Sequence, residues 1–395
     1  MVGYKSISPA NVSVLDFHLP KSTEHYRDLS SIYLKVDVKL TGVETDSKTE
    51  KTACINNLLH SLFSQIKIDL NGKTVENGDN YPYRSYIETV LNYGTDAQST
   101  HLTSGLFYLD DNDMGVETNS GFLKRKELLE KGVVELYGKL HGDLFHSPLL
   151  LALGTEMRIR LTRSAQNFLL LSNKLDSKAQ FTISDATLYV KHVTPAPSIL
   201  LAHTRTLSMG ANIRYHIKRV EVRSHTISAN ESSCSLDNFI LGQLPNYIVL
   251  GFLSNEAYTG KANLNSLNFH HFDYNYFALK VNGVQIQSDA LTPDWDKNKF
   301  SRCYNQLFID SLVKNGYQSN LITPERFAKG YHLLTFDLTP DSAGTESHSS
   351  LARHGSLRLD VRFAKPLEQA ITVLIYAAYD NTIEIDKTGT VFTDY

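Results

Sequence analysis

The segment His141-Gly142-Asp143, followed by His146, carries side chains that could do chemistry. A histidine beside a carboxylate can act as a general base. Hydrolytic or phosphate chemistry would also need a nucleophile motif such as Gly-x-Ser-x-Gly or a glycine-rich phosphate loop, and the sequence has neither. We therefore interpret these residues as structural.

A second group, His270, His271 and Asp273, lies in the aromatic segment NFHHFDYNYF. Metal enzymes of the cupin type use two histidines one residue apart, a nearby glutamate and a distant histidine, and this pattern does not occur in the sequence. Satisfied surface or interface histidines are the simpler interpretation. The sequence thus predicts no catalytic residue, no cofactor and no metal site.

The elements around these groups are short β-strands. In Ile66–Leu70 apolar residues alternate with Lys67 and Asp69, which predicts one buried and one solvated face. Asn71-Gly72 then supplies the two positive-φ residues of a tight type I′ hairpin turn. A second hairpin with the same layout runs from Phe277 to Ile286, around Asn282-Gly283.

The elements after each hairpin also match, in the same order. YPYRSYIETVLNYG follows the first hairpin and PDWDKNKFSRCYNQLF follows the second, each with apolar residues at helical spacing. Residues 157–161 then match 357–361, and residues 181–183 match 371–373. An order that never breaks, with loops of different length, indicates a duplicated domain.

The predicted fold is all-β: two consecutive eight-stranded antiparallel jelly rolls with short helices in the loops between strands. The segment HVTPAPSILLAHT is the best boundary, because Pro195 and Pro197 interrupt the strand pattern. We therefore assign residues 1–196 to the first jelly roll and residues 197–395 to the second.

The composition is that of an ordinary folded protein, with 42% hydrophobic and 21% charged residues and a net charge of −3. That charge disfavours wrapping of nucleic acid, and we expect Lys124-Arg125-Lys126 and Lys218-Arg219 to lie on solvated faces. No apolar run long enough for a membrane span and no signal peptide occurs, and the cysteines are three and scattered. These features fit a reducing cytosol or nucleus.

Several longer segments resemble the major capsid protein of Polinton (Maverick) elements and their adintovirus-like relatives. They lie in collinear order between Leu59 and Tyr395, and they read LHSLFSQIKIDLNG, YPYRSYIETVLNYG, IKRVEVRSHTI, GQLPNYIVLGFL, FDLTPD, GSLRLDVRFAKPL and AAYDNTIEIDKTGTVFTDY.

The resemblance implies a double jelly-roll capsid protein that is not an enzyme. Three chains would form a homotrimeric capsomer with a pseudo-hexagonal ring of six jelly rolls, and a lattice of trimers would tile an icosahedral virion shell. A penton protein is the expected partner at the fivefold vertices, and direct sequence-specific binding of nucleic acid is not expected. Assembly would take place in the host cytoplasm or nucleus.

Loops and termini complete this expectation. The long insertions 94–123 and 312–335 are candidates for the apolar trimer contacts. The residues before Leu15 are polar and rich in serine, and we expect a flexible tether there. The last predicted strand ends close to Tyr395, so no long C-terminal arm is expected.

Two other functions stay open from the residues alone. A two-domain jelly-roll lectin-like or receptor-binding protein would be expected to carry a signal peptide or exposed tryptophans, and this chain has one tryptophan, Trp295. A two-domain jelly-roll hydrolase would need a convergent acid or metal constellation.

Overall fold

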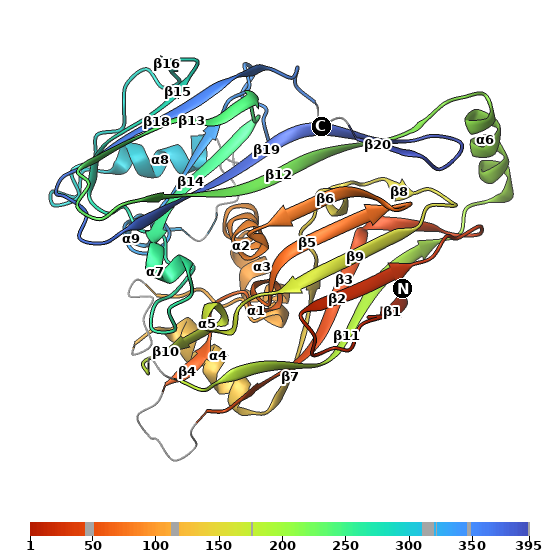
Figure 1. Cartoon of the computed structure of the whole chain (residues 1–395), viewed down its shortest axis with the longest axis horizontal. Helices are drawn as coiled ribbons and strands as arrows, with labels where there is room; N and C mark the ends of the chain where they lie inside the picture. Colours follow the sequence, from red (N-terminus) through yellow and green to blue (C-terminus); the bar gives the residue numbers. More distant parts are fainter. Residues whose placement is uncertain are drawn as a thin grey trace.

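The computed structural model describes residues 1–43, 51–111, 118–174, 177–309, 320, 322–345 and 349–393. The strands of the N-terminal half pair only with one another, as do those of the C-terminal half, in the ranges just given. Figure 1 shows the two halves as separate layered bodies, the first in red to yellow and the second in green to blue. The chain therefore folds as two jelly rolls, as the duplicated sequence pattern predicts.

The first jelly roll holds two antiparallel sheets that face each other. One has the order β1-β11-β3-β7, with β8 pairing to β3, and the other has the order β2-β9-β5-β6. The strands are β1 (Val2–Lys5), β2 (Val14–Leu19), β3 (Tyr26–Thr41), β5 (Phe63–Leu70), β6 (Lys73–Asp79), β7 (Val133–Lys139), β8 (Leu150–Leu151), β9 (Met157–Arg163) and β11 (Gln180–Val193); β4 (Thr52–Cys54) and β10 (Leu170–Ser172) form a small separate sheet.

The second jelly roll repeats the two four-strand orders of the first, and its additional short strand pairs at a different place. Its sheets have the orders β12-β19-β14-β17, with β20 pairing to β19, and β13-β18-β15-β16. The strands are β12 (Ile213–Ile227), β13 (Ser233–Gln243), β14 (Tyr247–Ser254), β15 (Tyr274–Val281), β16 (Val284–Gln285), β17 (Leu333–Asp337), β18 (His354–Phe363), β19 (Ile371–Ile385) and β20 (Val391–Thr393).

The matched sequence segments occupy equivalent strands in the two rolls. Residues 157–161 lie in β9 and 357–361 in β18, which are second in their sheets, while 181–183 open β11 and 371–373 open β19. The prediction of a duplicated eight-stranded unit is confirmed. The alternation that indicated the strands is visible in β2, where Leu15, Phe17 and Leu19 are fully buried between the sheets.

Both predicted hairpin turns have the predicted backbone. Asn71 and Gly72 have φ of 46° and 82°, and Asn282 and Gly283 have φ of 51° and 80°. These values fit a type I′ turn, whose two central residues both need positive φ. The Asn71 side chain accepts a hydrogen bond from the Glu156 backbone N–H at 2.9 Å. The Asn282 side chain likewise accepts a hydrogen bond from the Ser356 backbone N–H of β18.

Helices lie in the connections between strands, as predicted. The two predicted ones, α2 and α8, occupy equivalent places between β6 and β7 and between β16 and β17. The helices are α1 (Leu58–Ser61), α2 (Tyr81–Asn92), α3 (Thr95–Ser99), η1 (His101–Gly105), α4 (Ser120–Glu130), η2 (Leu144–His146), α5 (Gln166–Leu169), α6 (Pro197–Ser208), α7 (Asn255–Tyr258), α8 (Ser301–Ile309) and α9 (Pro324–Ala328). No helix within the described ranges is long and apolar enough to cross a bilayer.

The N-terminal segment is not a tether, so that prediction is wrong. Val2–Lys5 forms strand β1, which pairs with β11 in the register Val2 to Val190, and Lys5 Nζ lies 2.6 Å from Asp185 Oδ2. An edge strand of this kind is held by backbone hydrogen bonds, and its side chains stay exposed, so its polar composition gave no sign of it.

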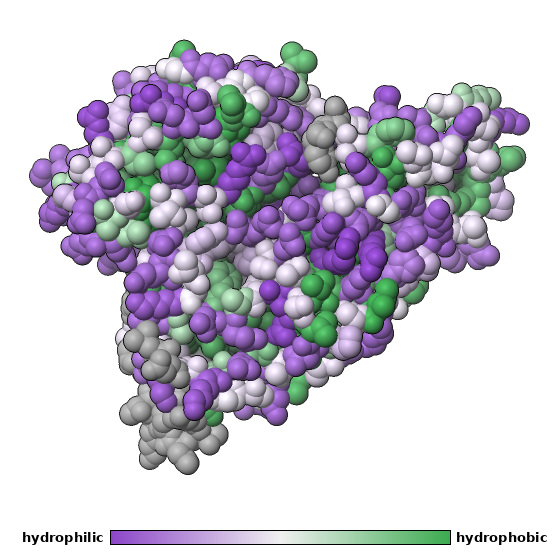
Figure 2. Space-filling view, viewed as in Figure 1, coloured by the Kyte–Doolittle hydropathy of each residue, from purple (hydrophilic) through white to green (hydrophobic). Residues whose placement is uncertain are grey.

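The segment between the rolls forms helix α6. Pro197 begins it, which suits a residue whose fixed φ fits the first helical turn. Figure 1 shows α6 at the tip of the arm formed by the ends of β11 and β12, and His203 of the helix is hydrogen-bonded to the Tyr26 hydroxyl of β3 at 2.6 Å. None of its residues is buried, and Ile199 and Leu201 are 46% and 65% exposed. Figure 2 shows green, hydrophobic side chains at this tip.

Candidate functional site

Helix α2 lies between the two jelly rolls (Figure 1), and its buried residues include Arg84 and Glu88. The helix begins after Asn80, whose φ is 56°. The Asn80 side chain bonds to the second roll instead of capping its own helix: Nδ2 donates to the Val222 carbonyl at 3.1 Å, and Oδ1 accepts from the Tyr258 hydroxyl at 3.1 Å. The start of α2 is thus attached to strand β12.

One guanidinium and three carboxylates form what we call the junction cluster: Arg84, Glu76, Glu88 and Asp143. Arg84 Nη1 donates to Glu76 Oε1 at 2.8 Å, and Nε donates to Glu88 Oε1 at 3.0 Å. Arg84 Nη2 lies 2.9 Å from Asp143 Oδ1 in an ion pair. All four side chains are at most 5% exposed. Buried charges persist only when they are paired and hydrogen-bonded in this way.

The second jelly roll completes the junction cluster. The Val220 backbone N–H donates to Asp143 Oδ1 at 3.1 Å, and the Tyr376 hydroxyl donates to Glu88 Oε1 at 3.1 Å. Val220 lies in β12 and Tyr376 in β19, which are neighbouring strands of one sheet. These two hydrogen bonds of the cluster therefore form only when the two rolls are docked.

Burial and nearby charges shift the pKa values of the three carboxyl groups in different directions. Burial, with the nearby Asp143 carboxylate, raises the pKa of Glu76 to about 8, and burial also raises the pKa of Asp143. Burial acts on Glu88 in the same sense, but the Arg84 charge and the hydrogen bonds from His141 and His146 together outweigh it and hold the pKa of Glu88 well below its usual value. Burial thus opposes ionisation of Glu76 and Asp143, whereas the surroundings of Glu88 favour its carboxylate form.

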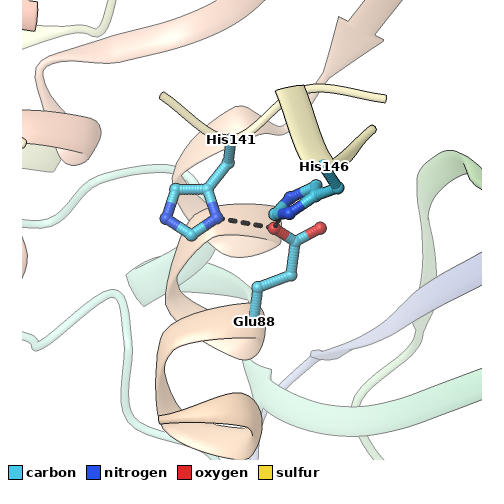
Figure 3. A group of neighbouring side chains, drawn as sticks. All are labelled: Glu88, His141 and His146. Atoms are coloured by element: carbon cyan, nitrogen blue, oxygen red, sulfur yellow. Dashed lines mark hydrogen bonds and ion pairs between the residues drawn. The ribbon is translucent and has the colours of Figure 1, made fainter. Parts of the chain in front are cut away.

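The rings of two histidines, His141 and His146, also lie beside the Glu88 carboxylate (Figure 3). His141 Nδ1 lies 2.5 Å from Glu88 Oε2, and His146 Nε2 lies 3.5 Å from it. The His141 ring is buried and its pKa is lowered by that burial, whereas the His146 side chain is 48% exposed. The sequence analysis singled out His141, Asp143 and His146, and the structure brings all three to one site.

A cavity of about 220 Å³ opens beside this group, between the rolls. The first roll contributes Glu88 and His146 to its lining, and the second contributes Lys218, Tyr247 and Tyr376. Lys218 Nζ lies 2.5 Å from Asp380 Oδ1, so its charge is already paired.

A separate buried ion pair links the first predicted insertion to both rolls. Arg125 Nη2 donates to Asp110 Oδ1 at 2.7 Å, and both side chains are fully buried. The Tyr331 hydroxyl is 2.9 Å from the Asp110 backbone oxygen. The prediction that Lys124-Arg125-Lys126 lies on a solvated face is wrong for Arg125, because its partner comes from a loop that a charge pattern does not reveal.

The two insertions predicted to make trimer contacts also meet within one chain. Asp110 belongs to 94–123 and Tyr331 to 312–335, and Leu106 and Phe107 are at most 2% exposed. Parts of both insertions, residues 112–117, 312–319 and 321, lie outside the described residues. In the described parts, much of the apolar surface therefore packs against the protein itself.

The second histidine group does not converge with the first. The His271 ring stacks on Trp295 with ring centroids 3.8 Å apart, and His271 Nδ1 lies 3.1 Å from Asp273 Oδ1. Trp295 Nε1 donates to the Tyr274 carbonyl at 2.8 Å. His270 is oriented separately, near Phe272. The tryptophan that a glycan-binding function would need on the surface is thus engaged in packing.

Sequence reasoning missed Arg84 and Glu88, which are the centre of the site. Both lie in the helix that was predicted, four residues apart and beside Tyr83 and Ile87 on a helix that proves to be buried all round. An Arg and a Glu at this spacing normally form a surface pair. The signal that could have distinguished them is the scarcity of other charged residues in YPYRSYIETVLN.

No family model matches the sequence. The uncharacterized protein F54H12.2 of Caenorhabditis elegans is 24% identical over 386 residues, which cover 94% of this chain and 91% of the nematode protein.

Similar solved structures come from viruses and virophages. A chain in the structure of the Sputnik virophage has a TM-score of 0.66 at 13% identity, with 100% of this chain and 87% of that chain covered. The Faustovirus major capsid protein has a TM-score of 0.62 at 9% identity, covering 96% and 89%. The mavirus major capsid protein has a TM-score of 0.56 at 12% identity, covering 100% and 89%. These neighbours share the double jelly-roll fold with this chain.

Proposed function

We propose that this chain is a major capsid protein that assembles as a pseudo-hexameric homotrimer and tiles an icosahedral virion shell. The observation that carries the proposal is the repeat of one eight-stranded jelly roll with the same strand orders, with both copies docked through a buried charge cluster. Two equivalent upright units per chain give six in a closed trimer, which is the shape that fills a hexagonal lattice.

The structural neighbours support this proposal over a lectin or a hydrolase. The Faustovirus and mavirus proteins are both major capsid proteins and share the fold over nearly the full length of this chain. A shell protein acts through its surfaces, so the proposed role is structural and not enzymatic. The apolar side chains exposed on α6, Ile199 and Leu201, suit contacts between subunits.

The more specific proposal is a capsid protein of a Polinton (Maverick) element or an adintovirus-like relative. The segment resemblance supports it, and so does the relative in Caenorhabditis elegans, because an element integrated in an animal genome would be found there. The proposed location is the virion, after assembly in the host cytoplasm or nucleus. The proposed partners are two further copies of the chain, neighbouring trimers, and a penton protein at the fivefold vertices.

Size-exclusion chromatography with mass measurement, followed by negative-stain microscopy, tests the proposal on the full chain. We expect a particle of three times the 44.4 kDa chain mass with a pseudo-hexagonal outline, and hexagonal arrays at higher protein concentration. A folded protein that stays monomeric over a wide range of concentration and salt would overturn it.

A further inference from the structure

We propose that Glu88, His141 and His146 form a binding site for a divalent transition-metal ion such as Zn²⁺ at the junction of the two jelly rolls. One donor atom from each of the three residues lies within 4.8 Å of the other two. We take the ligating atoms to be Glu88 Oε2, His141 Nδ1 and His146 Nε2, because both nitrogens already approach that oxygen. Figure 3 shows the two imidazoles placed around the carboxylate. The inference concerns a single chain, so it does not depend on capsid assembly.

The separations of the donor atoms suit a small ion. Ligands at about 2.1 Å from a tetrahedral Zn²⁺ are about 3.4 Å from one another. The distance from His146 Nε2 to Glu88 Oε2 is 3.5 Å, which already fits. His141 Nδ1 is 2.5 Å from the same oxygen, the distance of a shared proton, so the ion would replace that proton and open this pair by about 0.9 Å.

The charges of the junction cluster favour a divalent cation. In the part of the chain that the structure describes, Arg84 faces three buried carboxyl groups, so acidic side chains outnumber basic ones at this point of the junction. A divalent ion on Glu88 would add positive charge where the acidic side chains are in excess. Lys218, which lines the adjoining cavity, is neutralised by Asp380 and does not supply this charge.

Outer-shell contacts already hold two of the ligands in position. The other oxygen of Glu88 accepts hydrogen bonds from Arg84 and Tyr376, which fixes the carboxylate plane. The His141 backbone N–H donates to the Tyr81 hydroxyl at 3.2 Å, and the His60 ring packs edge-on against the His141 ring with centroids 4.7 Å apart. Such contacts are a regular feature of protein metal sites.

The site has an entry path and room for a fourth ligand. The His146 side chain is 48% exposed, and the cavity of about 220 Å³ beside it is large enough for water to complete a tetrahedron. Two imidazoles and one carboxylate favour Zn²⁺, Co²⁺ or Ni²⁺ over Ca²⁺ and Mg²⁺, which prefer oxygen ligands. A bound ion would fix α2 against the segment of the first roll that carries His141 and His146.

Titration of the full chain, stripped of metal with a chelator, tests this site. Calorimetry with Zn²⁺ alone is expected to give one ion per chain, and the unfolding temperature is expected to rise with Zn²⁺ concentration but not with Mg²⁺ or Ca²⁺. The variant His146→Ala should bind Zn²⁺ at least about 10-fold more weakly, since even outer-shell partners contribute 10–100-fold. The exposed His225→Ala on β12 is the matched control and should bind as the parent protein does.

A replacement ligand distinguishes coordination from a general structural effect. His146→Cys should retain binding, and its Co²⁺ complex should show a thiolate-to-metal charge-transfer band that the parent protein lacks. The unfolding temperature of each variant without metal shows whether it is folded. The proposal is overturned if Zn²⁺ leaves the parent protein's unfolding temperature unchanged, if His146→Ala binds Zn²⁺ as tightly as His225→Ala, or if His146→Cys gives no such band.

Discussion

Arg84 is the side chain on which the junction between the rolls most depends. It is 2% exposed and contacts all three carboxyl groups of the junction cluster. Removing one partner of a buried ion pair leaves the other charges without compensation, and this costs far more than the pair contributes when intact. The effect is large because Glu88 and Asp143 also bond to the second roll.

The variant Arg84→Met is therefore expected to lower the free energy of unfolding by about 3–5 kcal/mol. Arg158→Met is the matched control: Arg158 pairs with Asp16 on the surface and is 45% exposed, so its loss should cost at most about 1 kcal/mol. Urea unfolding of both variants measures the difference. If both variants lost the same free energy of unfolding, the junction would not depend on Arg84 as we expect.

His271 provides a pH dependence whose direction follows from its burial. Burial lowers its pKa from 6.5 to about 4; the neighbouring His270 acts in the same sense, while Asp273 opposes it. The unfolded chain thus binds a proton below pH 6.5 that the folded chain does not bind until about pH 4. The stability contribution is complete above pH 6.5 and is lost as the pH falls through this window.

We expect the free energy of unfolding to fall between pH 6.5 and 4, and His271→Phe to reduce this slope by up to about one proton, or 1.36 kcal/mol per pH unit. Phenylalanine can keep the stack on Trp295, the single tryptophan, whose fluorescence reports unfolding. His225→Gln, at an exposed position, should leave the slope unchanged. A slope unaffected by His271→Phe would show that His271 does not titrate in this way.

The asparagines of the two hairpin turns share one hydrogen bond to an adjacent segment, but in the described part of the chain only Asn71 makes a second one. Both asparagines accept a hydrogen bond from the strand beside them, Asn71 from Glu156 and Asn282 from Ser356. Asn71 Nδ2 also donates to the Gly389 carbonyl at 2.7 Å, in the turn between β19 and β20 of the other roll. The first hairpin thus helps to dock the rolls.

Replacement of each asparagine by glycine tests this difference while keeping positive φ accessible. Asn71→Gly should destabilise the protein by about 1 kcal/mol more than Asn282→Gly, which is the typical net contribution of one hydrogen bond. Chemical denaturation of the two variants gives the comparison, each turn serving as the control for the other. Similar losses would mean that the bond to Gly389 contributes little.

Local patterns predicted the repeated strands, both type I′ turns and the helices α2 and α8, because each depends on residues adjacent in sequence. They did not predict strand β1, whose pairing with β11 joins opposite ends of the first roll. Buried Arg84 and Arg125 were missed for the same reason. Their burial depends on partners such as Asp143 and Asp110, and tertiary docking alone brings them together.

The two rolls share more than a charged contact. The buried apolar residues of both rolls form one continuous cluster. Backbone bonds also cross between them: the Ser172 N–H donates to the Ala262 carbonyl at 2.7 Å, and the Ala152 N–H donates to the Tyr215 hydroxyl at 2.9 Å. Separation would expose apolar surface and several buried charges at once.

We therefore expect the proposed domains, residues 1–196 and 197–395, to unfold as one cooperative unit. Phe17 in β2 and Phe336 in β17 are both fully buried, one in each roll, so Phe17→Ala and Phe336→Ala should each cost about 3–5 kcal/mol. Differential scanning calorimetry of the full chain should show a single transition that either variant moves to lower temperature as a whole. Two transitions, with each variant moving only that of its own roll, would instead mean that the junction couples the rolls too weakly to make them one unit.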